Sequence, residues 1–123
     1  LMLETAHPGT CGLIAVSGAN LFPDCGPGFE EFKAWILSEG TPLAMMMLSE
    51  PDIDPKSLGA IGCPALVTVG GKDLISEEHT KLISDNIPDS ELIVVKNATH
   101  SSFIKRSPIM GRLLLDFMER HGY

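Results

Sequence analysis

Three short runs of apolar residues divide the chain into segments. They lie at residues 12–17, 65–70 and 91–96, and each is almost continuously hydrophobic instead of alternating with polar residues. Runs of this kind are typical of strands that are buried on both faces of a parallel sheet. The pattern therefore predicts three parallel strands.

Two segments with helical spacing follow the second and third runs. The first begins after Ser76, its predicted N-cap, has acidic residues in its first turn and ends before Pro88. The second begins at Ser107 and Pro108, an N-cap and N1 pair, and repeats apolar residues at helical spacing up to Gly122. Because strands and helices alternate, the chain is predicted to form right-handed βαβ units, so its fold class is α/β, a layered domain with a parallel sheet.

Residues 20–62 have a different pattern, in which Pro and Gly interrupt two short helical segments at 29–38 and 43–49. We predict that residues 1–123 form one partial domain, in which residues 20–62 are a short helical cap. Most apolar residues of the cap are expected to be core. Among them, Phe22, Trp35 and Met46 are predicted to contact a substrate, since pliable Met side chains accept varied shapes.

The composition limits the classes of partner. Hydrophobic residues make up 44% of the chain and charged residues 20%, which is typical of a globular protein. A net charge of −7 leaves no basic face for nucleic acid or for anionic membranes. The apolar stretches are much shorter than the roughly 20 residues that cross a bilayer. No secretory leader opens the chain, so a cytoplasmic protein is expected.

The cysteines and histidines give no metal-binding pattern. The three cysteines are odd in number and lack zinc-knuckle spacing, so reduced thiols are expected. His79 is expected on the solvated face of its helix, while His7 and His121 lie in turn or terminal contexts. No metal and no cofactor is predicted.

Two polar side chains follow the ends of neighbouring strands. Asp73 comes after the second strand and Gly70-Gly71-Lys72, and His100 comes after the third. Open α/β sheets place their sites at this edge, where a carboxylate can orient a histidine that acts as a base. Alone, Asp73 also fits a residue that caps a turn, and His100 fits a surface loop. Their joint position and order favour a functional pair.

Several linked motifs resemble the last third of α/β-hydrolase sequences. They are CPALVTVGGKDLI at 63–75, IPDSEL at 87–92, ATH at 98–100 and LLDF at 114–117. Upstream, residues 7–20 look like the family strand that follows the nucleophile-bearing helix. Asn97 stands where the family usually has Gly, but Asn tolerates left-handed backbone geometry, so the turn before His100 is expected to survive.

This resemblance implies the C-terminal half of an α/β-hydrolase fold, with about three parallel strands. It identifies Asp73 and His100 as the acid and base of a Ser-His-Asp catalytic triad. Leu1 to Ala6 then correspond to the tail of the nucleophile-bearing helix, and the G-x-S-x-G elbow is expected before Leu1. The implied parent is a serine hydrolase of esterase or lipase type that acts on a small-molecule acyl substrate, and the chain alone is expected to be an inactive fragment.

Two alternatives concern single residues. Ser17 sits centrally in an elbow-like stretch, but Asn20 to Pro27 do not have the pattern of the helix that an elbow requires. Asp24 is a rival to Asp73, because some α/β-hydrolases take their acid from after this strand.

Two further alternatives concern the whole chain. The first alternative is that the chain is a degenerate, non-catalytic α/β-hydrolase-like module for binding or assembly. Whether the parent is an enzyme stays open between this hypothesis and the serine hydrolase. An exposed sheet edge would favour a homodimer in either case. A nucleotide-binding domain is disfavoured, because no Gly-rich phosphate loop opens a helix.

Overall fold

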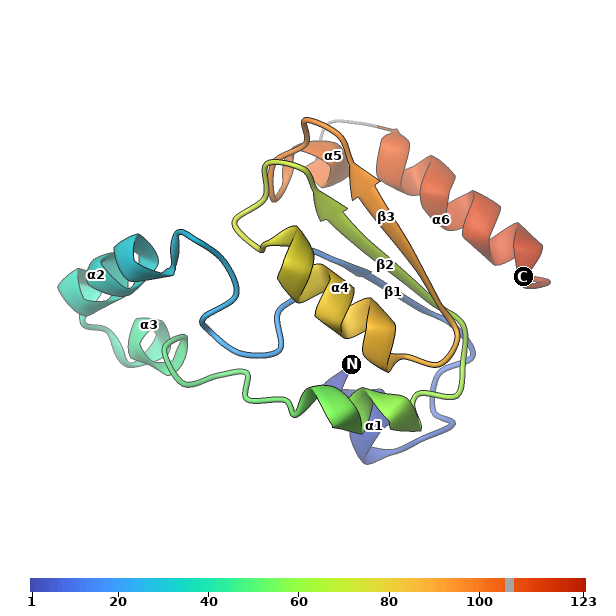
Figure 1. Cartoon of the computed structure of the whole chain (residues 1–123), viewed down its shortest axis with the longest axis horizontal. Helices are drawn as coiled ribbons and strands as arrows, with labels where there is room; N and C mark the ends of the chain where they lie inside the picture. Colours follow the sequence, from blue (N-terminus) through green and yellow to red (C-terminus); the bar gives the residue numbers. More distant parts are fainter. Residues whose placement is uncertain (106–107) are drawn as a thin grey trace.

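The centre of the fold is a parallel sheet of three strands. The computed structural model describes residues 1–105 and 108–123. The strands are β1 (Ile14–Ser17), β2 (Ala65–Gly70) and β3 (Ser90–Val95), in the order β1-β2-β3 (Figure 1). In the register, Val67 lies opposite Val16 on one side and Leu92 on the other. The predicted strands and fold class are confirmed.

Burial explains why the middle strand is continuously apolar. Every residue of β2 is buried, because strands flank it on both edges and helices cover both faces. Thr68 is the polar exception, and its hydroxyl donates to the Val16 carbonyl at 3.0 Å. A buried hydroxyl of this kind is tolerated because its hydrogen bond is made.

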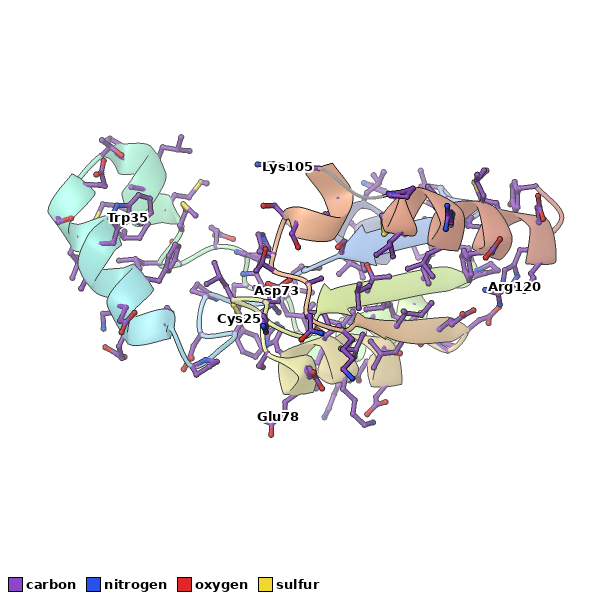
Figure 2. All side chains as sticks on the ribbon, turned by 90° about the horizontal axis from the view of Figure 1, so that it is seen from above. Cys25, Trp35, Asp73, Glu78, Lys105 and Arg120 are labelled. Carbon is purple, nitrogen blue, oxygen red and sulfur yellow. The ribbon has the colours of Figure 1, made fainter. Side chains whose placement is uncertain are left out.

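Helices lie on both faces of the sheet. In Figure 2, seen from above, the sheet separates the two sets of helices. The helices that pack near the sheet are α1 (Met2–Ala6), the 3₁₀ helix η1 (Pro55–Ala60), α4 (Glu77–Asn86), α5 (Ser102–Lys105) and α6 (Ile109–Arg120). η1 falls within the predicted cap, residues 20–62, but its Leu58 belongs to the core of the sheet domain. α4 and η1 lie on one face, and α5 and α6 on the other (Figure 1).

The main core lies under α4 and η1. Its fully buried large members are Leu21, Leu58, Ile61, Val67 and Ile83. A smaller cluster lies under α6, which buries Phe117 almost completely. Leu21, from the start of the predicted cap, thus belongs to the core of the sheet domain.

The helix ends are close to their predicted positions. Ser76 caps α4, since its Oγ accepts a hydrogen bond from the backbone N–H of His79 at 3.0 Å. Pro108 precedes the first residue of α6 instead of occupying it. The predicted N-cap Ser107 lies outside the described residues.

The cap contains α2 (Phe29–Glu39) and α3 (Pro42–Met46). These two helices pack together at a distance from the sheet, and two extended segments connect them to it (Figure 1). Thr41 caps α3 through its side-chain oxygen, which the sequence pattern did not identify. None of the helices in the described ranges is both long enough and apolar enough to cross a membrane.

Candidate active site

Asp73 lies in a tight turn directly after β2. The turn is closed by the Asp73 N–H, which donates to the Gly70 carbonyl at 3.1 Å. The turn is also bonded to the segment after β3, since Lys72 donates its N–H to the Ala98 carbonyl at 2.8 Å. A Cβ at Gly70 would overlap the Ala98 carbonyl oxygen, so this close approach requires glycine. The two strand ends are therefore held together by backbone contacts.

His100 follows β3 through a turn in which Asn97 has a φ of 61°. Asn tolerates this left-handed conformation, as the sequence predicted for the position where the resembled family has Gly. The turn brings His100 Nδ1 to 2.8 Å from Asp73 Oδ1. The structure thus brings together the two residues that the sequence singled out.

The environments of the two side chains differ. The Asp73 side chain is 0% exposed, whereas that of His100 is 49% exposed. Asp73 Oδ1 also accepts from the Ile75 N–H at 3.0 Å, which satisfies part of the buried carboxylate. Because a carboxylate only accepts, His100 must donate from Nδ1, and its Nε2 is left to exchange protons with a reactant.

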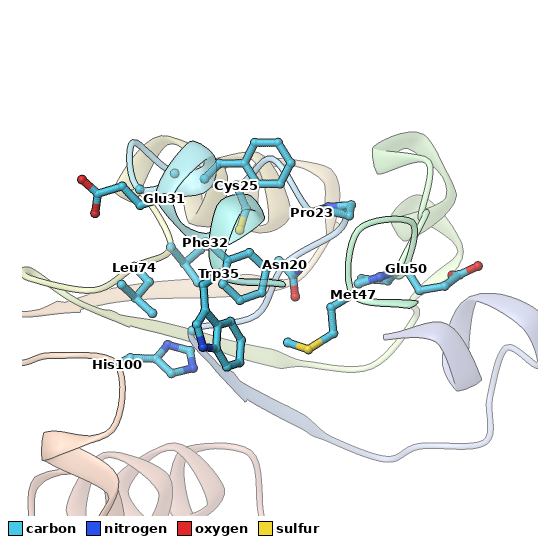
Figure 3. Close-up of a pocket in the computed structure, with 16 residues that line it drawn as sticks. Asn20, Pro23, Cys25, Glu31, Phe32, Trp35, Met47, Glu50, Leu74 and His100 are labelled. Atoms are coloured by element: carbon cyan, nitrogen blue, oxygen red, sulfur yellow. The ribbon is translucent and has the colours of Figure 1, made fainter. Parts of the chain in front are cut away.

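A cavity of about 640 Å³ opens beside this pair, between the cap and the carboxyl ends of the strands (Figure 3). Its apolar lining comes mainly from Phe29, Phe32, Trp35, Met47, Leu74 and Ile75. Gly18 also lines it, and a Cβ there would lie 2.9 Å from His100 Cε1 and 3.1 Å from Asp73 Oδ2. Any side chain at Gly18 would therefore disturb the pair.

The three predicted substrate contacts have different positions. Trp35 and His100 both line the cavity, Trp35 from α2 of the cap and His100 from the segment after β3. Phe22 does not line it and packs against the core, edge-on to His79 at 4.7 Å between ring centroids. Met46 points elsewhere and is 48% exposed, while its neighbour Met47 contributes to the lining. Their apolar character was readable in the sequence, but the side on which they face was not.

The alternative residues do not complete the pair. The Ser17 hydroxyl is buried and has no hydrogen-bond partner among the described residues. No helix follows it directly, since α2 begins only at Phe29, so Ser17 does not have the setting of a nucleophile elbow. Asp24 lines a separate depression, and the carboxylate bonded to His100 is that of Asp73.

The prediction that His79 lies on a solvated face is wrong. The residue is only 6% exposed, and its Nε2 accepts a hydrogen bond from the Leu21 N–H at 2.9 Å. Burial lowers the pKa of His79, and the carboxylate of Asp24 partly opposes this effect. The segment after β1 folds over α4 and covers the ring, which the periodicity of α4 alone cannot show.

The cysteines are free thiols, and burial raises the pKa of each. Cys25 lines the cavity, but a raised pKa disfavours the thiolate that a nucleophile requires. Across residues 1–105 and 108–123, no group of three or more His, Cys, Asp or Glu side chains is arranged to hold a metal ion.

Comparison with known proteins gives relatives of partial coverage. No protein-family model matches the chain. A proline iminopeptidase of Thermoplasma volcanium is 34% identical over 70 residues, which are 57% of this chain and 23% of that protein. The chain thus spans about a quarter of the length of this curated relative.

Solved structures that match nearly all of the chain include two hydrolases. An alpha/beta hydrolase enzyme from the sediment metagenome of the Mar Chica lagoon has a TM-score of 0.74 and 12% identity, with 99% of this chain and 56% of that chain covered. A thermophilic esterase has a TM-score of 0.72 and 20% identity, with 98% of this chain and 61% of that chain covered. At these identities the similarity defines the fold.

Proposed function

Since this chain has the α/β-hydrolase fold, we propose that it supplies the base and the orienting acid of a serine hydrolase. The observation that carries this proposal is the 2.8 Å bond between His100 Nδ1 and Asp73 Oδ1 at the mouth of an apolar cavity. Related proteins that carry the names esterase and iminopeptidase support hydrolysis as the reaction class.

In the proposed mechanism, His100 Nε2 removes the proton from a serine hydroxyl as its oxygen attacks an ester carbonyl. The ring then carries a positive charge, which the buried Asp73 carboxylate stabilises. His100 next donates the proton to the leaving alkoxide, so that an acyl-enzyme and an alcohol result. Water repeats the sequence, and the acid and the free serine are released.

The serine in this proposal comes from a part of the protein outside residues 1–123. This is supported by the coverage of the solved neighbours, which are longer than the chain, and by the setting of Ser17. The isolated chain is then expected to be inactive. A fluorophosphonate probe tests this directly, since labelling of Ser17 in the isolated chain would contradict it.

The proposed substrate is an ester with a small to medium uncharged acyl group. The lining of the cavity is mainly apolar and includes aromatic, Met, Leu, Ile and Pro side chains, and such a lining favours apolar ligand surface. Trp35 lines the same cavity as His100 and would contact the acyl group.

The decisive variant is His100→Ala in the full-length protein that contains this segment. Loss of a triad base lowers kcat by about 10⁴- to 10⁶-fold, so aryl-ester hydrolysis should almost disappear. His7→Ala is the matched control, because His7 is an exposed residue near the start of the chain and far from His100 in the sequence. Full activity in His100→Ala would exclude the proposed base.

A second candidate is hydrolysis of an amide that follows a protonated amino group. Glu31 and Glu50 line the cavity, whereas no Lys or Arg belongs to its described lining. Two carboxylates favour a cationic ligand, and one relative carries the name proline iminopeptidase. Comparing an aryl ester with an N-terminal proline arylamide discriminates the two, and Glu31→Gln should lower kcat/KM only for the arylamide.

A further inference from the structure

The two segments that connect the cap to the sheet converge on the backbone of Leu21. Residues 18–28 lead from β1 into α2, and residues 47–54 return from α3. The Leu21 carbonyl accepts from the Ile53 N–H at 2.8 Å, and the Leu21 N–H donates to His79 Nε2 at 2.9 Å. The Leu21 side chain is fully buried in the main core. Leu21, which belongs to the first connecting segment, thus hydrogen-bonds to both the second connecting segment and α4.

Further contacts hold the first connecting segment against the start of α4. The Ser76 N–H donates to the Cys25 carbonyl at 2.8 Å. A Cβ at Gly26 would overlap the Leu74 carbonyl oxygen, so the two backbones are in close contact there. Figure 2 shows Cys25 near Asp73, at the end of the sheet that faces the cap. The segment held by these contacts is therefore also a wall of the cavity.

The Leu21 bond specifies the state of the His79 ring. A ring nitrogen accepts a hydrogen bond only when it carries no proton, so Nδ1 must hold the single proton. In the imidazolium form both nitrogens donate, and Nε2 would face the Leu21 N–H donor. Asp24 and Cys25 of the connecting segment and Glu78 of α4 share the depression that His79 lines. Phe22 packs edge-on against the ring.

We propose that His79 is a positioning residue, whose neutral, Nδ1-protonated ring tethers the segment that leads into the cap, residues 18–28, to α4, and whose protonation breaks this tether. The tether orders Asn20, Pro23 and Cys25, which line the cavity beside His100. Its effect on turnover rests on the proposed function, but the tether itself does not. Burial lowers the pKa of His79, so the tether persists below the ordinary histidine pKa and is lost only in more acidic solution.

Nitrogen-15 NMR of the 123-residue chain tests the tether without any activity assay. At neutral pH, His79 Nε2 should resonate as an unprotonated nitrogen and show a scalar coupling to the Leu21 amide nitrogen across the hydrogen bond. A protonated Nε2 at neutral pH would overturn the proposal, whatever the outcome of the esterase assays.

Hydrogen exchange supplies the second measurement. In His79→Leu, exchange of the Leu21 amide should be about 5- to 30-fold faster than in the unmutated chain, as expected for the loss of one buried hydrogen bond. The Val67 amide in β2 serves as the internal reference. His79→Gln retains an acceptor and should restore much of the protection, and this variant remains informative if His79→Leu fails to fold.

The pH dependence separates a tether from mere packing. As the solution is acidified, the exchange protection of the Leu21 amide relative to the Val67 amide should fall in the unmutated chain. It should stay constant in His79→Gln, since an amide oxygen does not titrate. The fluorescence of Trp35, the one tryptophan of the sequence, reports on the cap in the same samples. His7→Gln is the matched control and should behave like the parent. If Leu21 protection has the same pH dependence in the unmutated chain and in His79→Gln, the proposal is refuted.

Discussion

The contact between Gly70 and the segment before His100 makes Gly70→Ala the sharpest probe of the site. The new Cβ would lie 2.8 Å from the Ala98 carbonyl carbon, whereas ordinary contacts begin at 3.4 Å. The His100 segment must therefore retreat by at least 3.4 − 2.8 = 0.6 Å. A shift of this size that carries His100 directly away from Asp73 would lengthen their 2.8 Å hydrogen bond to 3.4 Å, which is beyond the usual limit of about 3.2 Å for such bonds.

The energetic cost follows from overpacking of backbone against a new methyl group. Such substitutions cost about 1–3 kcal/mol. With a urea m value of about 2 kcal/mol/M, a loss of about 2 kcal/mol lowers the unfolding midpoint by about 1 M. The same variant should lose the NMR signal of the His100 Nδ1 proton, because the bond that shields this proton from solvent is weakened.

Gly71→Ala is the matched control in the neighbouring position. Its Cβ would find its nearest neighbour at 3.5 Å, which is ordinary contact. Its stability should stay within about 0.5 kcal/mol of the parent. Equal urea midpoints for Gly70→Ala and Gly71→Ala, or an intact His100 proton signal in Gly70→Ala, would show that the Gly70 contact does not hold the pair together.

Three further predictions test other parts of the structure. Phe117→Ala should lower the free energy of unfolding by about 3–5 kcal/mol in urea titrations, whereas Leu115→Ala, exposed on the same helix, should change it by about 0.5 kcal/mol or less. Backbone hydrogen bonds from Gly9 and Cys11 lower the pKa of the Glu4 carboxyl, so its contribution to stability is present above the ordinary Glu pKa and is lost as the pH falls through the lowered one. Glu4→Gln should therefore unfold with a shallower acid dependence, and an unchanged pH profile would contradict this role. We also predict a homodimer through the β1 edge, which light scattering after size-exclusion chromatography can measure. Ala15→Pro should give a monomer, because the Ile14 and Gly18 N–H groups bond toward β2 and that of Ala15 points to the free edge.

The sheet and the Asp73–His100 pair were readable from the sequence for a common reason. Continuous apolar runs are typical of parallel strands, and this signal is local to each strand. The expected burial on both faces holds throughout only for β2, since Ala15 of β1 and Val94 of β3 are exposed. Residues that follow parallel strands emerge at one edge of the sheet, so the positions of Asp73 and His100 followed from the strand assignment alone. Their 2.8 Å separation adds the geometry but does not alter the assignment.

The surroundings of the pair depend on contacts between segments distant in the chain. His79 has the sequence context of an exposed helical residue, but Leu21 reaches it from 58 positions away and buries it. Likewise, Phe22 and Met47 are both apolar cap residues, yet Phe22 enters the core and Met47 lines the cavity. Local periodicity reports how much apolar surface an element must bury, but not which distant segment will cover it. The strands and the strand-end pair were therefore encoded locally, whereas the cavity and the His79 contact arise only when the segment after β1 folds over α4 and places the cap opposite the strand ends.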